Sequence, residues 1–178
     1  METLILTVIG DDRAGLVSSL ARIVTECGGN WERSQLAELA GKFAGIVVVA
    51  VPSERVAEFT SALAPLAGLL DITVHAGTVA QPASPGADGA GEGRGIRLDL
   101  VGNDHPGIVG AVSEVLARHG VNVEELTTAT GPAPMAGGQL FEAHVVATAP
   151  PSSDLAALRA DLERLATEIQ VDLDVADL

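Results

Sequence analysis

Hydrophobic and polar positions along the chain follow one cycle that runs twice. A continuous apolar run over residues 3–10 predicts a buried strand. Beyond a polar turn, apolar side chains recur at helical spacing and form one helix face, at Leu16, Leu20, Ile23, Val24 and Cys27. Residues 30–39 and 43–51 then read as two strands, and the tight turn 40–42 between them predicts a hairpin.

The cycle closes with a second helix and a final strand. We expect the helix to begin after Pro52, with Ser53 as its N-cap. Its apolar stripe consists of Val56, Phe59, Leu63 and Leu66. Residues 72–74 end the cycle as a strand, so the element order is β-α-β-β-α-β, the split βαβ pattern of ferredoxin-like folds. This order predicts a four-stranded antiparallel sheet with both helices on one face and no cover on the other.

The second half of the chain repeats the first. Gly107 follows Gly15 by 92 residues (107 − 15), and the same offset joins Gly120 to Gly28, where a left-handed glycine is expected to end the first helix. The second helix stripe then falls at Ile108, Val112, Val115, Leu116 and His119. After the hairpin the offset becomes 99, which matches Val56, Ile72 and Val74 with Leu155, Val171 and Leu173. We therefore expect a second hairpin seven residues longer, with a turn at 132–138.

These patterns place the chain in the α+β class, as two ferredoxin-like βαββαβ units. We assign residues 1–79 to the first domain and residues 95–178 to the second. Residues 80–94 are rich in Pro, Gly, Ala and Ser and lack apolar periodicity, so they are expected to form a flexible linker.

Composition excludes several classes of partner. Apolar residues make up 47% of the chain but aromatic residues only 2%, so the cores must be aliphatic and base-stacking platforms are not expected. The net charge is −14, with 10 basic residues scattered among 24 acidic ones. Direct nucleic-acid binding and docking on an anionic membrane are therefore not expected, because both need clustered Lys and Arg.

Cysteine usage and the start of the chain bear on where the protein works. Cys27 is the single cysteine and lies on the apolar stripe of a predicted helix, so we interpret it as buried filler without a disulfide. The first strand starts close to Met1, without the features of a signal peptide. We expect a cytoplasmic protein.

The polar turn between the first strand and the first helix of each unit is the candidate site. A helix N-terminus offers free backbone N–H groups and partial positive charge, so it can hold a carboxylate, and a nearby Asp or Asn could take an ammonium group. A free α-amino acid would satisfy both. The candidate ligand-binding residues are Asp11, Asp12, Arg13, Ala14, Gly15 and Leu16 in the first turn, and Asn103, Asp104, His105, Pro106, Gly107 and Ile108 in the second.

Capping is the alternative interpretation of both turns. Asp or Asn before a helix is a common N-cap, and Pro106 suits a first helical turn. Asn30 and Asn122, two residues after the helix-ending glycines, are second-tier candidates that could equally cap turns. They could begin their strands near the other unit's helix turn.

The sequence offers no catalytic or metal-binding constellation. The four histidines do not lie at metal-ligand spacing, and no set of nucleophile, base and acid can be assembled. His105 could face a ligand but is expected to face water, and His119 is expected to interact with the last carbonyls of its helix. We expect neither an enzyme nor a cofactor.

Both turns resemble the start of the ACT domain, a small amino-acid-sensing module. The resemblance rests on Asp12-Arg13-Ala14-Gly15-Leu16-Val17 and on Asn103-Asp104-His105-Pro106-Gly107-Ile108-Val109, each followed by an amphipathic helix and Gly-x-Asn. It covers nearly the whole chain outside the linker. A pair of ACT domains with nothing else is similar to the glycine cleavage system transcriptional repressor family. Ala14 departs from the usual Pro, so the second turn fits the pattern better.

The resemblance implies a regulatory protein that senses a small amino acid, with glycine or serine as the expected ligand. It implies a ligand at an interface between ACT units, and action through a protein partner such as a transcription regulator rather than on DNA directly. We also expect a homodimer. The alternative is an ACT module that serves dimerisation or interaction without any ligand.

Overall fold

The chain forms two compact units, Met1–Pro82 (unit 1) and Ala83–Leu178 (unit 2). The structure is a computed structural model and describes residues 1–77, 93–133 and 138–178. Most of the predicted linker, residues 80–92, lies outside the described residues, and its last residue, Arg94, opens a strand.

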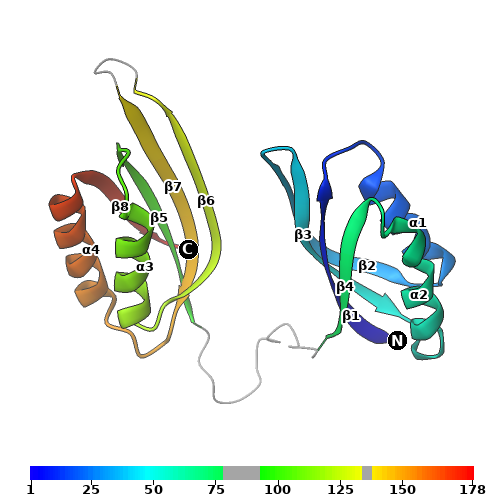
Figure 1. Cartoon of the computed structure of the whole chain (residues 1–178). Coiled ribbons are helices and arrows are strands. Elements are labelled where there is room, and N and C mark those ends of the chain that lie inside the picture. Colours follow the sequence, from blue (N-terminus) through cyan, green and yellow to red (C-terminus); the bar gives the residue numbers. More distant parts are fainter. Residues whose placement is uncertain (78–92, 134–137) are drawn as a thin grey trace. The chain divides into compact units, whose positions relative to one another are not determined.

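Unit 1 has the expected β-α-β-β-α-β order. Its strands are β1 (Glu2–Asp11), β2 (Asn30–Leu39), β3 (Lys42–Val51) and β4 (Leu70–Ala76). Its helices are α1 (Leu16–Glu26) and α2 (Val56–Ala62), with short 3-10 turns η1 (Ser53–Arg55) and η2 (Ala64–Leu66) on either side of α2. The strands pair antiparallel in the order β2-β3-β1-β4, and both α-helices lie on one face of this sheet (Figure 1).

Unit 2 repeats this architecture. Its strands are β5 (Arg94–Asn103), β6 (Asn122–Pro132), β7 (Gln139–Ala149) and β8 (Val171–Asp177), and its helices are α3 (Ile108–Arg118) and α4 (Leu155–Ile169). The antiparallel order is β6-β7-β5-β8, with α3 and α4 together on one face (Figure 1). The predicted fold class is therefore confirmed.

Each core lies between the sheet and its two helices. In β1 every second side chain points to the helices, so Leu4, Leu6 and Val8 are buried while their neighbours are not. Phe59 from α2 and Leu158 from α4 are fully buried at equivalent places in the two cores. Cys27 is buried in the first core, as expected.

Glycine conformations confirm the predicted helix ends and the first hairpin. Gly28 and Gly120, just after α1 and α3, both have φ of +69°, the left-handed conformation that ends a helix. In the β2–β3 turn, Ala40 (φ 52°) and Gly41 (φ 77°) are both left-handed, as a two-residue hairpin turn requires. No helix within the described ranges is long and apolar enough to span a bilayer.

The predicted N-cap of the second helix is wrong. Ser53 is the first residue of η1, whose N-cap is Pro52, and no side chain caps that turn. The chain enters through this tight turn because the Arg55 N–H donates to the Pro52 carbonyl at 2.8 Å. In unit 2, by contrast, the carboxylate of Asp154 accepts two backbone N–H bonds and caps α4.

Strand pairing also corrects the repeat offsets of the later elements. Gly10 pairs with Phe43 and Gly102 with Phe141, so β7 follows β3 by 98 residues (141 − 43) and the second hairpin is six residues longer, not seven. Residues 134–137 of its turn lie outside the described residues. Ile72 corresponds to Leu173 rather than Val171. Ile72 pairs with Val8 and Leu173 pairs with Leu100, and Val8 and Leu100 occupy equivalent sites in β1 and β5. The residues added between β7 and β8 belong to the segment that contains α4, which is longer than α2.

Candidate functional site

Each of the two predicted turns joins the first strand of its unit to a helix that begins at a left-handed glycine. Gly15 (φ 95°, ψ −3°) is the N-cap of α1, and Gly107 (φ 102°, ψ −8°) is the N-cap of α3. Because only glycine adopts this conformation readily, the sequence repeats it at both places. No side chain caps either helix.

The capping interpretation of the turn residues is therefore wrong. Asp12 and Asp104 lie three residues before the N-cap glycines, and neither carboxylate bonds to its helix N-terminus. Pro106 precedes the N-cap and lies outside α3. The first-turn N–H groups of both helices lack the partner that an Asp or Asn cap would supply.

A backbone bond anchors each turn to the hairpin beside it. The Asp12 N–H donates to the Gly41 carbonyl at 2.9 Å, and the Asp104 N–H donates to the Gln139 carbonyl at 2.8 Å. Glycine precedes each turn because a side chain has no room there: a Cβ on Gly10 would meet the Leu69 carbonyl oxygen. These contacts fix the strand-to-helix path, so the two turns present the same backbone.

The side chains of the first turn are exposed. Asp11, at the end of β1, forms an ion pair with Lys42, its partner residue at the start of β3. This contact with the Lys42 ammonium lowers the pKa of the Asp11 carboxyl group. Asp12, Arg13, Ala14 and Gly15 are exposed, and Leu16 is buried as the first residue of α1. The carboxylate of Asp11 is already neutralised within the unit.

The second turn is held by its histidine instead. His105 Nδ1 lies 3.1 Å from the Pro106 carbonyl oxygen and Nε2 lies 3.0 Å from the Ile169 carbonyl oxygen, at the end of α4. Two carbonyls can both accept only if both ring nitrogens carry hydrogen, as in imidazolium, so these bonds raise the pKa of His105. The expectation that His105 faces water is wrong: the ring is half-buried and bridges the turn to α4.

The other residues of the second turn remain accessible. Asn103 and Asp104 are exposed, as are Pro106 and Gly107, while Ile108 is buried at the start of α3. Asn103 pairs across the sheet with Leu140, so the lysine contact of the first turn has no counterpart here. The two turns thus share a backbone and differ in how their side chains are fixed.

Asn30 and Asn122 do not lie beside the turn of their own unit. Each is exposed and begins the strand that follows the helix, β2 or β6. The helices α1 and α3 have 11 residues each, so at about 1.5 Å per residue roughly 16 Å separates each Asn from its turn.

Comparison with known proteins identifies both units. Residues 2–77 and residues 96–163 each match the ACT domain, and the two ranges together cover more than half of the chain. The chain belongs to the ACT-domain family. Each unit is one ACT domain, and the chain is a tandem ACT protein, as its internal repeat predicts.

The similar proteins extend this assignment to the whole chain. The chain is 29% identical over 168 residues to the glycine cleavage system transcriptional repressor of Escherichia coli strain K12, which covers 93% of this chain and 85% of that protein. A crystal structure of an unknown protein from Galdieria sulphuraria has a TM-score of 0.85 and 31% identity, with coverage of 99% and 98%. A crystal structure of a candidate glycine cleavage system transcriptional repressor shares the fold, with a TM-score of 0.65, 16% identity and coverage of 99% and 97%. The tandem ACT protein thus resembles a regulatory protein.

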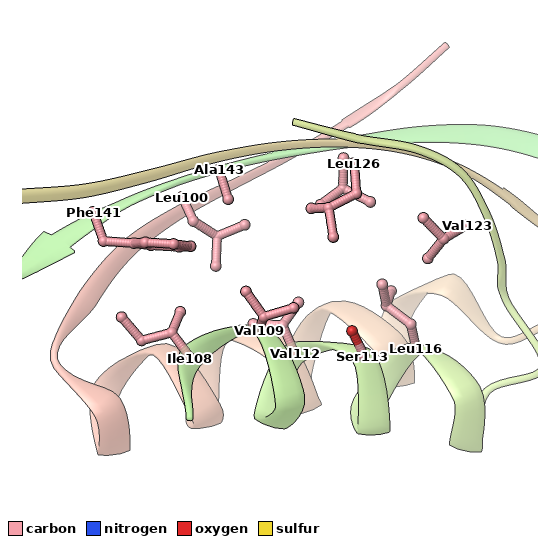
Figure 2. A pocket seen from close by; sticks show the side chains of 11 residues that line it. Leu100, Ile108, Val109, Val112, Ser113, Leu116, Val123, Leu126, Phe141 and Ala143 are labelled. Carbon is pink, nitrogen blue, oxygen red and sulfur yellow. The ribbon is translucent and has the colours of Figure 1, made fainter. Parts of the chain in front are cut away.

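The ACT domain of unit 2 contains an apolar pocket that sequence reasoning missed. The pocket lies between α3 and the sheet, beside the edge strand β6, and its volume is about 270 Å³ (Figure 2). Ile108, Val112 and Leu116 line it from the helix, and Phe141 lines it from β7. It begins at Ile108, the residue after the N-cap glycine of the second turn.

A sequence signal for this pocket exists in the repeat. Val123, which lines the pocket and remains 39% exposed, occupies the position of Trp31 in the ACT domain of unit 1. The Trp31 side chain is half-buried and packs against the first core. The smaller Val123 leaves space where the other ACT domain places an indole.

Two further histidines contact carboxylates. His119 Nε2 lies 3.0 Å from a carboxylate oxygen of Asp161, which ties the end of α3 to α4, so the expected contact with helix carbonyls is wrong. His144 on β7 pairs with Asp99 on β5 at 2.5 Å. Within the described ranges, no group of three or more His, Cys, Asp or Glu side chains is arranged to hold a metal ion.

Proposed function

We propose that this tandem ACT protein is a regulatory sensor of a small amino acid. The observation that carries the proposal is the pair of helix N-termini at Gly15 and Gly107, each begun by a left-handed glycine and left without a side-chain cap. Such N-termini attract a carboxylate through free N–H groups and the helix dipole. Ligand binding would favour one arrangement of the units over another, which is what a regulatory switch requires.

The exposed acids beside these N-termini supply the second half of the recognition. Asp12 and Asp104 occupy the same place in the two turns, and both are anchored through their backbone N–H groups. Their carboxylates are available to an ammonium group, whereas Asp11 is occupied by Lys42. We therefore assign the ligand carboxylate to the helix N-terminus and the ligand ammonium to Asp12 or Asp104.

The second turn is the stronger candidate, because the Asp104 N–H anchors it to the hairpin and His105 anchors it to α4. His105 fixes it to the end of α4, so the turn loses less conformational entropy when a ligand binds. Asn30 and Asn122 remain second-tier candidates, and contact between either of them and a ligand would require a neighbouring unit. An interface between ACT units would supply this, as the resemblance implies.

Glycine or serine is the proposed ligand, and a transcription regulator is the proposed protein partner. The similar Escherichia coli protein is named for repression of the glycine cleavage system, which supports both assignments. The net charge of −14 supports action through a protein rather than on DNA. A homodimer and a cytoplasmic location belong to the same proposal.

Calorimetric titration of the full chain with free amino acids tests the sensor function. We expect glycine or serine to release heat and to raise the melting temperature, and Asp104→Asn to weaken this binding by about tenfold, the loss of one charged contact. Asp174→Asn, an exposed acid on β8 that pairs with Asp99, four residues before the second turn, is the matched control and should bind as the parent does.

The same titration separates the alternatives. Leucine or phenylalanine binding more tightly than glycine would shift the ligand class towards side chains that fill the pocket beginning at Ile108. Loss of binding in Asp12→Asn but not in Asp104→Asn would move the site to the first turn. A complete panel of amino acids without heat or thermal shift would overturn the sensor proposal.

The second candidate function is a ligand-independent interaction module. The observation that favours it is the apolar sheet surface of unit 1 that faces away from its helices, with Ile9 and Ile46 exposed. Self-association that is indifferent to every amino acid would support this function over the sensor.

A further inference from the structure

The sheet surface of unit 1 opposite α1 and α2, its outer face, has an apolar centre. Three neighbouring cross-strand pairs of β1 and β3 form this centre: Ile5 with Val48, Thr7 with Ile46, and Ile9 with Ala44. Ile9 and Ile46 retain 52% and 49% of their exposure, which is unusual for isoleucines on central strands. Within unit 1, both helices pack on the opposite face.

The outer face of unit 2 has the same register but carries charges. The equivalent pairs are Arg97 with Val146, Asp99 with His144, and Val101 with Glu142. The Asp99 carboxylate lies 3.2 Å from Arg97 and 2.5 Å from His144, so its partners lie within the same face. The ACT fold therefore does not require an apolar outer face, and unit 1 must have another reason for one.

The charges of the first outer face lie at its rim. Arg33 stands on the edge strand β2, and Asp71 and His75 stand on the opposite edge strand β4. The Lys42–Asp11 ion pair closes the hairpin end. An apolar centre with a polar rim is the anatomy of a protein–protein interface.

We propose that this outer face is the interface of a homodimer and packs against the same face of a second copy of the chain. The inference rests on the homodimer included in the proposed function and names the surface that forms it. The face has a neutral, apolar centre, so the surface that matches it best is another apolar face, and two-fold pairing of identical patches is the commonest way for a chain to self-associate.

The size of the face is sufficient for such a dimer. The strands lie about 4.8 Å apart, and three of them are about 33 Å long and β4 about 23 Å, so the face presents roughly 600 Å² per copy, hence roughly 1,200 Å² for the pair. This total reaches the lower limit of stable, specific interfaces, so we expect a reversible dimer. Two stacked sheets would enclose the isoleucines in a layer about 10 Å thick.

The rim charges are compatible with two-fold pairing. A two-fold axis that runs along the strands lays the β2 edge of each copy over the β4 edge of the other. Arg33 then lies at the level of the partner's His75, and Asp71 lies at the level of the partner's Ala37, so the rim does not place Asp71 against another acid.

Analytical ultracentrifugation of the full chain over a wide concentration range tests the interface. Ile9→Lys and Ile46→Lys each place a charge in the centre of the face, and we expect either one to weaken the dimer at least a hundredfold. The matched control is Val101→Lys, at the position in unit 2 that corresponds to Ile9, where Glu142 and Asp172 receive the new charge. It should dimerise as the parent does, and circular dichroism and thermal unfolding check that each variant is folded.

The outcomes separate the interface from the dimer itself. A parent that stays monomeric at all concentrations overturns both the homodimer and this interface. A parent dimer that survives Ile9→Lys and Ile46→Lys in folded form overturns the interface alone, as does a dimer broken equally by Val101→Lys. A monomeric parent that associates only with a different protein assigns the face to that partner and overturns the pairing of copies.

Discussion

Units 1 and 2 share a backbone plan and differ in the side chains around it. Both have the strand order of the ACT fold, both start their first helix at a left-handed glycine, and both anchor the preceding turn to the hairpin. They differ in three places: the outer sheet face is apolar in one and charged in the other, the turn is held by Lys42 or by His105, and the position beside the first helix holds Trp31 or Val123.

The comparison teaches which features the fold itself demands. Glycine repeats at the N-cap and helix-ending positions, where φ is positive, and at Gly10 and Gly102, where a side chain would clash. Surfaces are free to diverge, because a charged outer face and an apolar one are both compatible with the same sheet. Differences between the units therefore indicate function more directly than their similarities do.

Of the differences between the units, the one between Trp31 and Val123 should have the largest effect on stability, and two single substitutions test it. We expect Trp31→Val to lower the free energy of unfolding by about 1–3 kcal/mol, since a half-buried indole is lost. Val123→Trp should instead fill the pocket and raise the free energy of unfolding by about 0.5–1 kcal/mol. Urea unfolding measures both, and a destabilising Val123→Trp would mean that the pocket cannot accept an indole.

The N-cap glycines provide the next effect, and here the units should respond alike. Gly15→Ala and Gly107→Ala each force alanine into a left-handed conformation, which should cost about 1–2 kcal/mol. Gly110, three residues further along in α3, is a built-in control, because it is helical and has open space around it. Gly110→Ala should stabilise the protein by about 0.5–1 kcal/mol in the same chemical denaturation experiment. Unequal costs at Gly15 and Gly107 would contradict the shared geometry.

The smallest expected effect is the pH dependence that His105 gives to unit 2. Its pKa is raised in the folded protein, so its contribution to stability is complete below the unfolded value of about 6.5 and is lost as pH rises through the folded value. Melting temperatures of the parent and of His105→Gln should therefore converge between neutral and alkaline pH and separate in acid. A difference that is constant with pH would show that the ring is not charged.

The local plan of the fold could be predicted from the sequence. The apolar run of β1, the helical spacing of α1 and the doublet Gly28-Gly29 depend on short-range periodicity, and each predicts its element within a few residues. The repeat then extends the same reasoning to unit 2. These features are local, so neighbouring residues contain enough information.

Other features depend on residues distant in sequence and were missed or mispredicted. Spacing alone matches Ile72 with Val171, whereas pairing with β1 and β5 gives the true correspondence with Leu173. The acceptor of His105 is a carbonyl 64 residues away at the end of α4, which no local pattern shows. Which turn residues bind a ligand stays a prediction, because their side chains are exposed and their contacts depend on a ligand or a neighbouring unit.

The sequence by itself determined two ACT domains, their element order and the glycine positions, because periodicity and backbone sterics act over a few residues. Only the tertiary structure decided that glycines rather than acids begin α1 and α3, that a pocket opens beside Val123, and that Ile9 and Ile46 share the sheet face of unit 1 opposite its helices. Each of these depends on which strands become neighbours, and strand pairing is a property of the whole sheet.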